Sequence, residues 1–272
     1  MMRAAADQMI RTFSGNTSGL CRRLEGKVAI VTASTQGIGF SIAKRLAEEG
    51  AKVMISSRKE ANVNSAVQKL LNEGLQASGV VCHVANKEDR KRLLDETKAK
   101  FGGLDILVSN AAVNPAVGPV LDCSEDVWDK IFDINVKSTY LLMKEARPLL
   151  KQGKSPSIII ISSIAGYQPF GLLGVYSISK TALIALCKAT YEDLAGDGIR
   201  VNCIAPGVIK TKFSQAMYQS ESIEETTKSK IPMGRLGLPD EMGGIAAFLA
   251  SDDASYITGE TIVASGGMPS RL

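Results

Sequence analysis

The sequence predicts an α/β fold, in which a single doubly wound sheet of about seven parallel strands carries helices on both faces. Three observations predict it. Short runs of apolar, often β-branched residues alternate with longer segments whose apolar residues recur every three or four positions. The chain has 272 residues, enough for one domain of this kind. Of these, 45% are hydrophobic and 22% are charged, which is typical of a globular protein and excludes wholesale disorder.

The predicted strands are short and rich in valine and isoleucine. The strand at 157–161, for example, contains four consecutive isoleucines. An unbroken apolar run of this kind is expected where a parallel strand is buried on both faces. The full set of predicted strands is 27–33, 53–57, 80–84, 105–108, 157–161, 200–205 and 261–264.

The predicted helices separate or follow these strands. The first of them places Ile38, Ile42 and Leu46 on one face. Regular alternation of strand and helix implies right-handed crossovers, which put helices on both faces of a parallel sheet. The predicted helices are 37–49, 61–71, 90–100, 125–150 and 176–195.

The chain divides into a flexible N-terminal extension, residues 1–23, and one folded domain, residues 24–272. The extension lacks long apolar periodicity and contains the loop-like run Ser-Gly-Asn-Thr-Ser-Gly. It carries four arginines and one aspartate, so it holds three of the four net positive charges of the chain. Inside the domain, residues 211–230 are polar, helix-prone and interrupt the alternation, and we expect them to form a lid over a site.

Composition excludes several classes of function. A net charge of +4, from 32 basic and 28 acidic residues, is too mild for a nucleic-acid-binding protein. The chain has five cysteines without a C-x-x-C spacing and a single histidine, so we expect no metal site. The cysteines are expected to be small core residues in a reducing compartment. No apolar run approaches the ~18 residues of a membrane span.

A glycine-containing segment joins the first predicted strand to the first predicted helix. Helix N-terminal amides attract an anion at such a junction, and glycines let the backbone approach it. The segment therefore predicts a Rossmann-type dinucleotide site, although two glycines alone also suit a tight strand-to-helix turn. The candidate cofactor-binding residues here are Thr32, Ser34, Thr35, Gly37, Ile38 and Gly39.

The end of the second strand predicts which dinucleotide binds. Enzymes that use NAD usually place an acidic residue there to bind the ribose hydroxyls. This chain instead has Ser57, Arg58 and Lys59. A carboxylate repels a 2′-phosphate, whereas an arginine can bind it with two parallel hydrogen bonds. These residues therefore favour NADP(H), the alternative being a solvated basic turn.

A tyrosine and a lysine four residues apart are candidates for acid–base chemistry. Tyr176 and Lys180 share one face of a helix. A nearby ammonium and a cationic nicotinamide ring favour the phenolate, so the tyrosine can exchange a proton with a carbonyl oxygen. Ser163 ends the strand at 157–161, where it can hydrogen-bond the reacting oxygen.

Taken together, these residues resemble the short-chain dehydrogenase/reductase family from Leu24 to the C-terminus. The order and spacing of the matching motifs are jointly specific, and these are Thr32–Gly39, Ser109–Ala112, Asn135–Ser138, Ser163, Tyr176-x-x-x-Lys180 and Pro206-Gly207. The resemblance implies a catalytic tetrad of Asn135, Ser163, Tyr176 and Lys180. In it Tyr176 is the acid, Ser163 orients the carbonyl, Lys180 holds the nicotinamide ribose and Asn135 anchors a water.

The same resemblance implies further cofactor contacts. Asn110 stabilises the central strand beside the cofactor, and Thr211 lies near its phosphates. The remaining implied contacts are His83, Val84, Ala111, Pro206, Gly207 and Ile209, with Tyr176 and Lys180 at the nicotinamide end. Two residues depart from the family pattern: Ala33 replaces a glycine, and His83 stands where many members have an aspartate near the adenine.

Other segments resemble a branch of the family made up of peroxisomal, NADPH-dependent retinol dehydrogenases/reductases, in which both departures are usual. The segments that carry this resemblance are Leu24–Thr35, Ser56–Lys59, Val81–Val84 and Ala254–Glu260. It implies reduction of retinal, aromatic ketones and dicarbonyl compounds, and assembly as a homotetramer.

Both ends of the chain bear on localisation. Ser270-Arg271-Leu272 is similar to the C-terminal S-K-L address that a peroxisomal import receptor binds. The arginine-containing, acid-poor N-terminus is the competing feature, because it resembles a mitochondrial presequence. We expect the peroxisome, with the mitochondrion as the alternative.

The sequence thus predicts NADPH-dependent reduction of a small carbonyl substrate, or oxidation of the matching alcohol. One alternative is a reductase of 3-oxoacyl substrates of the β-oxidation type, for which Lys210, Lys212 and Lys228 near the lid are suitable. A second is a scaffold that binds the cofactor without catalysis, which a complete tetrad disfavours.

Overall fold

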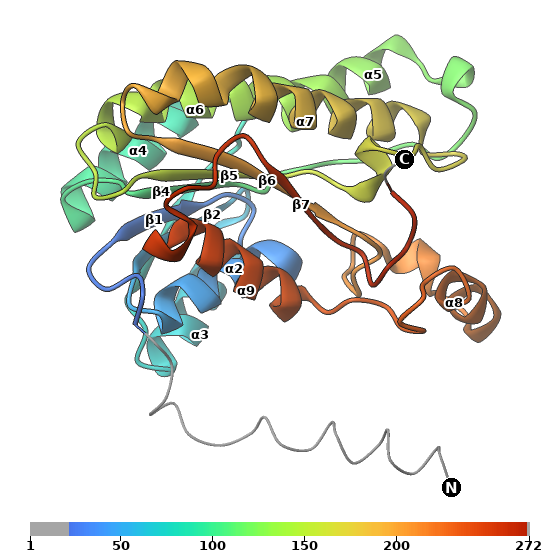
Figure 1. Cartoon of the computed structure of the whole chain (residues 1–272), viewed down its shortest axis with the longest axis horizontal. Helices are drawn as coiled ribbons and strands as arrows, with labels where there is room; N and C mark the ends of the chain where they lie inside the picture. Colours follow the sequence, from blue (N-terminus) through green and yellow to red (C-terminus); the bar gives the residue numbers. More distant parts are fainter. Residues whose placement is uncertain (1–21, 271–272) are drawn as a thin grey trace, which may run out of the picture.

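The computed structural model describes residues 22–270, and these form one parallel sheet of seven strands in the order β3-β2-β1-β4-β5-β6-β7 (Figure 1). The order reverses between β1 and β4, so chain crossovers leave in opposite directions from this point. The doubly wound α/β fold is confirmed. The strands are β1 (Val28–Val31), β2 (Lys52–Ser57), β3 (Ala77–Val81), β4 (Ile106–Ser109), β5 (Ser157–Ile161), β6 (Arg200–Pro206) and β7 (Thr261–Ala264).

Helices cover both faces of the sheet. One face carries α2 (Gly37–Glu48), α3 (Glu60–Asn72) and α9 (Pro239–Ala250), and the other carries α4 (Lys87–Phe101), α5 (Glu125–Phe132), α6 (Ser138–Leu150) and α7 (Gly174–Ala195) (Figure 1). The short α8 (Glu221–Lys228) lies beyond β7 at one end of the molecule, inside the segment predicted to be a lid.

Each face has its own hydrophobic core because strand side chains alternate between the two. Ile30 and Leu107 pack against α4, α6 and α7, whereas Val31 and Ile106 pack against α2 and α9. All four side chains are fully buried. Burial of such a side chain stabilises the fold by about 1.5–3 kcal/mol.

Strand β3 lies three residues earlier than the prediction of 80–84. It begins at Ala77 and runs through Gly79, whose missing side chain leaves room for Val63 and Val67 of α3. Small residues do not form a recognisable apolar run, so this part of the edge strand was missed. His83 and Val84 consequently lie in the loop after the strand rather than within it.

The helix predicted over 125–150 is interrupted. Residues Asp133–Lys137 form a π-helical turn between α5 and α6. The hydroxyls of Ser138 and Thr139 donate to the carbonyls of Ile134 and Asn135, at 2.6 and 2.9 Å, alongside this wider turn. A π-turn inserts one extra residue and changes which side chains face a neighbour. Here it places Asn135 in the protein interior.

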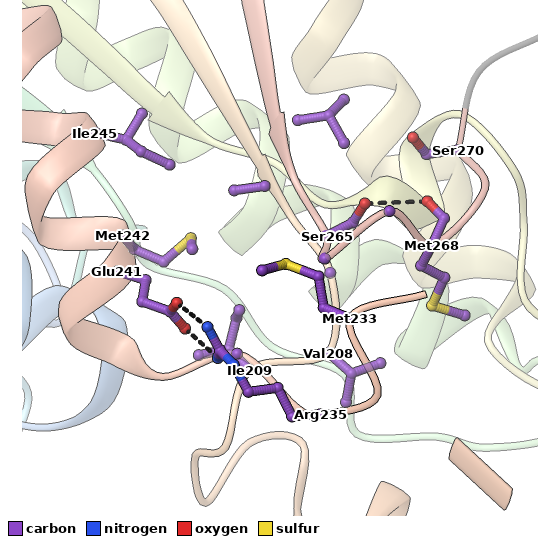
Figure 2. A pocket seen from close by; sticks show the side chains of 16 residues that line it. Val208, Ile209, Met233, Arg235, Glu241, Met242, Ile245, Ser265, Met268 and Ser270 are labelled. Carbon is purple, nitrogen blue, oxygen red and sulfur yellow. Dashed lines mark hydrogen bonds and ion pairs between the residues drawn. The ribbon is translucent and has the colours of Figure 1, made fainter. Parts of the chain in front are cut away.

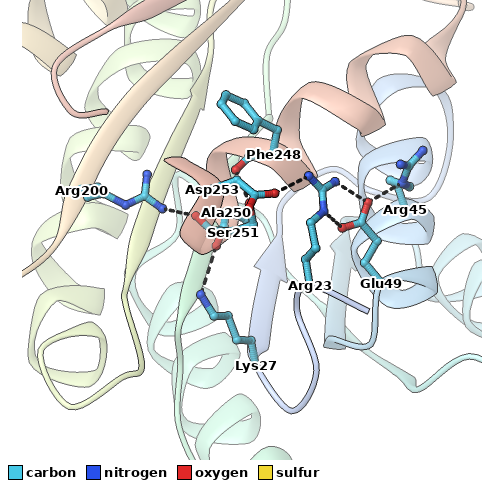
Figure 3. Close-up of polar contacts among 9 residues, drawn as sticks. All are labelled: Arg23, Lys27, Arg45, Glu49, Arg200, Phe248, Ala250, Ser251 and Asp253. Carbon is cyan, nitrogen blue, oxygen red and sulfur yellow. Dashed lines mark hydrogen bonds and ion pairs between the residues drawn. The ribbon is translucent and has the colours of Figure 1, made fainter. Parts of the chain in front are cut away.

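Helix α9 was not predicted, although the sequence contains signals for its start. Pro239 occupies the first turn, and the carboxylate of Glu241 accepts a hydrogen bond from the Leu238 amide at 2.7 Å. Its C-terminal end is held by two cations. Arg200 donates to the carbonyls of Leu249 and Ser251. Lys27 donates to the carbonyl of Ala250 (Figure 3). Helix α9 packs against α2, where Ser41 donates a 2.7 Å hydrogen bond to Asp240.

Arg23, assigned above to the N-terminal extension, binds the folded domain. Its guanidinium forms two hydrogen bonds of 2.8 Å with Glu49 and one of 3.0 Å with Asp253 (Figure 3). The rest of the predicted extension, residues 1–21, and the last two residues, Arg271 and Leu272, lie outside the described part of the chain.

Within residues 22–270, no helix is long and apolar enough to cross a membrane, and no group of three or more histidine, cysteine or acidic side chains could hold a metal ion. Cys82, Cys187 and Cys203 are buried free thiols, as expected of core residues, whereas Cys123 is partly exposed.

Candidate active site

The predicted functional residues gather at the carboxyl ends of the strands. Loops after six neighbouring strands, β3 to β6 in the order of the sheet, lie there, on both sides of the point where the strand order reverses. In an open α/β sheet this edge is where ligands bind. Residues more than 170 positions apart in the sequence are thereby brought to one edge of the sheet.

The loop between β1 and α2 has the geometry of an anion site. Gly37 has a φ of +58°, and a Cβ on Gly39 would lie 2.4 Å from the Asn110 side chain, so neither position tolerates a larger residue without strain. The first turn of α2 contains no acidic residue, and Gln36 at its N-cap makes no side-chain hydrogen bond to the helix. The amides at this terminus therefore remain for an anion such as a pyrophosphate.

The hydroxyls predicted beside the cofactor are used within the protein. Thr32 Oγ1 accepts from the amides of Asn110 and Ala111, at 3.0 and 3.2 Å, and Asn110 Nδ2 donates back to the Thr32 carbonyl at 3.0 Å. Ser34 donates to the Val31 carbonyl at 2.6 Å. Thr32 and Ser34 are fully buried, so they shape the loop, while the partly exposed Thr35 and Ile38 border it.

The basic residues after β2 are free to bind a ligand. Arg58 and Lys59 are exposed, and neither forms an ion pair with another residue of the described chain. Ser57 is half-buried, and its carbonyl accepts from the Cys82 amide, which ties this turn to the loop carrying His83. No carboxylate ends β2, in agreement with the sequence.

Tyr176, Lys180 and Ser163 are brought together as predicted. Lys180 Nζ lies 5.5 Å from the centre of the Tyr176 ring and donates a 2.8 Å hydrogen bond to the Ile161 carbonyl at the end of β5. The Ser163 side chain hydrogen-bonds Tyr176. Tyr176 is 9% exposed and Lys180 is 2% exposed, so both polar groups are largely removed from water.

Burial dominates the protonation of this pair in the chain itself. It raises the pKa of Tyr176 to about 12, against the lowering effect of the Ser163 hydrogen bond, and it lowers the pKa of Lys180 to about 8. The lowering of the tyrosine pKa expected from its lysine neighbour is therefore not present in the protein alone. At neutral pH the Tyr176 hydroxyl holds its proton, which suits an acid.

The side chain of Asn135 is connected to Tyr176 by hydrogen bonds. Its Oδ1 accepts from the Val113 amide at 2.8 Å, and its Nδ2 donates to the Val113 carbonyl at 3.1 Å and to Ser179 Oγ at 3.0 Å. Ser179 in turn donates to the Tyr176 carbonyl at 2.6 Å. The π-turn thus connects the loop after β4 to the tyrosine helix.

Sequence reasoning missed two residues that position the lysine. Ser162 donates to the Lys180 carbonyl at 2.8 Å, and a Cβ on Gly166 would lie 2.8 Å from the carbonyl carbon of Lys180. The serine that precedes Ser163 and the glycine three residues after it are visible in the sequence, but nothing in their spacing predicts these contacts.

The segment after β6 reaches across to the first helix. The Gly207 amide donates to the Ala264 carbonyl at 2.9 Å, and Ile209 is buried. Thr211 lies beside the N-terminus of α2, since a Cβ on Gly37 would be 3.4 Å from its methyl group. Ser214 hydrogen-bonds Ile209 and Thr211, which closes a tight turn.

An apolar cavity of about 210 Å³ opens beside Tyr176. It lies between the loop over 114–123 and the segment 172–175 at the start of α7. Its aliphatic wall side chains include Val117, Val120, Leu172 and Leu173, and Asn114 and Asp122 also line it. Phe213, from the segment predicted to be a lid, places its ring centre 5.7 Å from that of Tyr176. Neither lysine nor arginine lines the cavity.

A larger cavity of about 580 Å³ lies between α9 and the C-terminal segment (Figure 2). Gly207 and Ile209 border it, but no member of the predicted tetrad does. Its charged residues, Arg235 and Glu241, neutralise each other through hydrogen bonds of 2.6 and 3.0 Å. Ser270, the first residue of the C-terminal tripeptide, is 9% exposed and lines this cavity.

The arrangement suits a dinucleotide. It supplies an uncapped helix N-terminus beside two glycines, exposed cations at the end of β2, and a buried acid next to an apolar cavity. Chemically, it can hold a carbonyl oxygen between two hydroxyls and deliver a proton to it.

Comparisons with known proteins agree with this geometry. Residues 32–269 match the model of a family described as enoyl-(acyl carrier protein) reductase. Dehydrogenase/reductase SDR family member 4 of Oryctolagus cuniculus is 54% identical, covering 94% of this chain and 99% of that protein. Short-chain dehydrogenase/reductase SDRA of Arabidopsis thaliana is 52% identical, covering 93% and 98%. The crystal structure of a putative gluconate dehydrogenase from Agrobacterium tumefaciens superposes with a TM-score of 0.88 at 28% identity, covering 93% of this chain and all of that one.

Proposed function

This chain belongs to the short-chain dehydrogenase/reductase family, and from that premise we propose that it reduces ketones and aldehydes with NADPH. Members of the family are oxidoreductases that bind a nicotinamide cofactor and act on carbonyl or alcohol groups of small molecules. The observation that carries the proposal is the buried Tyr176 hydroxyl, which hydrogen-bonds Ser163 beside an apolar cavity.

In the proposed mechanism the cofactor, when bound, supplies the hydride that reduces the carbonyl carbon. Tyr176 donates its proton to the carbonyl oxygen, and Ser163 donates a hydrogen bond to the same oxygen and orients it. Lys180 holds the nicotinamide ribose and, as a cation, favours the phenolate that forms when Tyr176 gives up its proton. Asn135 anchors a water through which that proton is replaced.

The choice of NADP(H) rests on the residues after β2. Arg58 and Lys59 are exposed and unpaired within the described chain, and they suit a 2′-phosphate. We expect Arg58→Asp to lower kcat/KM for NADPH at least tenfold relative to that for NADH, because a carboxylate repels the phosphate. Steady-state kinetics with both cofactors measure the ratio, and an unchanged ratio would remove Arg58 from the argument. Lys69→Asp, on the other end of α3, is the control.

The cavity favours lipophilic carbonyl substrates such as retinal, aromatic ketones and dicarbonyls. Its walls are mainly aliphatic, with Asn114 and Asp122 as polar lining, and Phe213 adds an aromatic surface next to Tyr176. The name of the dehydrogenase/reductase relatives, which specifies no substrate, is compatible with this class.

A 3-oxoacyl thioester is the second candidate, favoured by the description of the matching family model. A coenzyme A substrate needs cations around the entrance. Lys228 is already paired with Glu224 and Glu225, and Lys210 Nζ lies 5.6 Å from the centre of the Tyr218 ring. Lys228 is therefore occupied, whereas Lys210 and Lys212 are exposed and form no ion pair within residues 22–270, so the lysines alone do not decide between the two candidates.

A substrate panel tests the proposal. All-trans-retinal, a simple aromatic ketone and a 3-oxoacyl-CoA are compared by NADPH oxidation under identical conditions. We expect the first two to have the higher kcat/KM. A preference for the thioester would replace the proposal with the second candidate, and cofactor binding without any turnover would support a scaffold.

Two further proposals concern the protein in the cell. The exposed aromatic side chains of Trp128 and Tyr140, on α5 and α6, support association into a homotetramer, which light scattering measures.

Ser270-Arg271-Leu272 supports import into the peroxisome, with the mitochondrion as the alternative through the N-terminal segment. Imaging of the full chain with and without each end separates the two destinations.

A further inference from the structure

Ser179, which directly precedes Lys180 on helix α7, has a hydroxyl that is hydrogen-bonded on both sides. Its side chain is fully buried. Its Oγ accepts from Asn135 Nδ2 at 3.0 Å and donates to the Tyr176 carbonyl at 2.6 Å. A hydroxyl carries one proton, so it can donate toward only one of these two neighbours. It therefore forms a directed link from the Asn135 side chain to the backbone of the tyrosine.

The direction of this link is set at the far side of the Asn135 amide. Asn135 Oδ1 accepts from the Val113 amide at 2.8 Å, and Nδ2 donates to the Val113 carbonyl at 3.1 Å. Turning the side-chain amide over would place oxygen against oxygen and N–H against N–H, so the pair admits one orientation. In that orientation the second hydrogen of Nδ2 faces Ser179. The serine must accept it and give its own proton to the Tyr176 carbonyl.

The link joins the wall of the cavity beside Tyr176 to the helix that carries this tyrosine. Val113 directly precedes Asn114, where the loop that lines the cavity begins. In the part of the chain that the structure describes, Ser179 is the only side chain of α7 that hydrogen-bonds Asn135, and none hydrogen-bonds the loop itself. The hydrogen-bonded connection from α7 to this wall therefore passes through one hydroxyl.

Other side chains tie the same helix to the end of β5. Ser162 donates to the Lys180 carbonyl at 2.8 Å, and Thr181 donates to the Gly166 carbonyl at 2.7 Å. Both contacts hold α7 against the segment after β5, which carries Ser163. They fix the position of the tyrosine relative to this serine, but they do not fix it relative to the cavity wall.

We propose that Ser179 is a positioning residue, which sets the distance between the Tyr176 hydroxyl and a substrate carbonyl held in the cavity. This inference rests on the proposed function. The serine acts through Asn135, which holds the Val113 peptide on its other side. A misplacement of about 1 Å can cost about 10²-fold in rate, so a small shift of the wall against the acid is sufficient. Loss of the hydroxyl removes this constraint and leaves one buried N–H of Asn135 without an acceptor.

Steady-state reduction of an aromatic ketone by NADPH tests the proposal in Ser179→Ala. We expect kcat to fall about tenfold, because the acid and the carbonyl are no longer held in register. The KM for NADPH should stay within about twofold, since Ser179 makes no hydrogen bond to the β1–α2 loop or to the turn after β2. Ser179→Thr keeps the hydroxyl and should keep kcat within about threefold of wild type. An unchanged kcat in Ser179→Ala would overturn the proposal.

Ser177→Ala is the matched control. Ser177 is equally buried and lies two residues away on the same helix, but its hydroxyl has no hydrogen-bond partner within residues 22–270. The same atom is removed without breaking a hydrogen bond, so we expect kcat within about twofold of wild type. Equal losses of kcat in Ser177→Ala and Ser179→Ala would show that any cut in this part of the helix disturbs the site, and would overturn the proposal.

A double-mutant cycle with Asn135→Ala distinguishes positioning from support of the fold. If Ser179 acts through Asn135, Ser179→Ala lowers kcat about tenfold in the wild-type background but less than about twofold in the Asn135→Ala background. The full loss in both backgrounds would contradict the link. Should Ser179→Ala fold poorly, Ser179→Cys, whose thiol is only a weak donor, takes its place in the cycle.

Hydrogen exchange of the protein without cofactor makes this outcome separable from that of the proposed function. In Ser179→Ala we expect the amides of residues 110–116 and 174–180 to exchange at least about tenfold faster than in wild type, while those of β5 do not change. Ser177→Ala should change neither set. If the wild type reduces no carbonyl but these amides respond, the proposed function fails and the positioning of Tyr176 by Ser179 stands. If the wild type reduces carbonyls and these amides do not respond, the positioning is refuted.

Discussion

Two buried charges at opposite edges of the sheet, Glu49 and Lys180, have opposite surroundings. At the amino ends of the strands, Glu49 is 1% exposed and receives hydrogen bonds from Arg23 and Arg45 (Figure 3). At the carboxyl ends, Lys180 is equally buried but meets only the Ile161 carbonyl and the face of the Tyr176 ring. No carboxylate within the described chain pairs with it.

The pKa values of Glu49 and Lys180 reflect these different surroundings. Burial alone would raise the pKa of Glu49, but the hydrogen bonds from Arg23 and Arg45 hold it below its ordinary value. Burial lowers the pKa of Lys180 to about 8, and the neighbouring Cys203 only partly opposes it, because no carboxylate is paired with the ammonium. A charge with partners stabilises the fold, whereas a charge without them is available to a ligand and destabilises the unliganded protein.

The largest expected effect is at Tyr176, at the carboxyl edge of the sheet, which should serve catalysis and not the stability of the fold. We expect Tyr176→Phe to reduce kcat by about 10²–10⁴-fold, the usual contribution of a positioned acid. Stability should change by less than about 1 kcal/mol, since the ring and its contact with Phe213 remain. Substrate-dependent NADPH oxidation and thermal unfolding measure the two effects. Full activity in this variant would refute the mechanism.

At the amino edge, Glu49→Ala should destabilise the fold and leave catalysis unchanged. Removing one partner of a buried pair costs about 3 kcal/mol of unfolding free energy, while kcat per folded molecule stays unchanged. The pKa of Glu49 is lowered in the fold, so its contribution is present above about pH 4.5, the ordinary value, and is lost as pH falls through the folded pKa. Denaturant unfolding at pH 7 and at pH 3.5 measures the difference, which should shrink at the lower pH.

Glu260→Gln is the matched control for that experiment. Glu260 is 59% exposed and pairs with Lys188 at 3.4 Å, so its loss should cost less than about 0.5 kcal/mol. An equal cost in the two variants would mean that burial of Glu49 adds nothing to its pairing.

The sequence predicted the fold well wherever apolar periodicity alone determines an element. Strands β5 and β7 match the prediction to the residue, because their apolar or β-branched runs end at sharp turns. Periodicity failed where packing against other elements decides. Gly79 belongs to β3 because α3 fills its space, and the π-turn at Asp133–Lys137 does not alter the apolar spacing around it.

The candidate active site shows the same division between what local spacing predicts and what only the folded chain decides. Tyr176, Lys180 and Ser163 could be placed together because helical spacing and strand ends fix them. The contacts that position them could not, since Ser162 bonds the Lys180 carbonyl and Ser179 accepts from Asn135, and only the folded chain brings these distant groups together. The tyrosine pKa was misjudged for a related reason, because burial is not visible in a sequence.

Lys180→Met tests the contrast between Glu49 and Lys180, because it removes the buried charge that no carboxylate pairs with. We expect catalysis to be lost and the protein to become more stable, by about 2 kcal/mol at pH 7. The shift of the pKa to about 8 corresponds to roughly 3 kcal/mol of burial cost, and losing the hydrogen bond to Ile161 offsets about 1 kcal/mol.

The gain in Lys180→Met should depend on pH in a defined way. Between pH 8 and the ordinary value of 10.5 the unfolded chain binds more protons than the folded one, so wild-type stability rises over this range. The advantage of the variant is therefore largest below pH 8 and shrinks above it. Lys188→Met, on an exposed part of the same helix, is the control and should stay within about 0.5 kcal/mol of wild type.

The smallest expected effect concerns backbone strain at the carboxyl edge. Ala33, where the family pattern has a glycine, has a φ of +49°, which costs an alanine about 1 kcal/mol. Ala33→Gly removes that strain but adds conformational freedom to the unfolded chain, so we expect a net gain of about 0.5 kcal/mol, or roughly 1–2 °C in Tm. Ser155→Gly, with a φ of +45° in a turn at the amino edge, is the comparison and should gain less, because it also loses the hydrogen bond from the Ser155 side chain to Asp252. If Ser155→Gly stabilises the protein and Ala33→Gly does not, the methyl of Ala33 makes contacts that outweigh its strain. The unfavourable contribution at the carboxyl edge would then come from the buried Lys180 and not from the backbone.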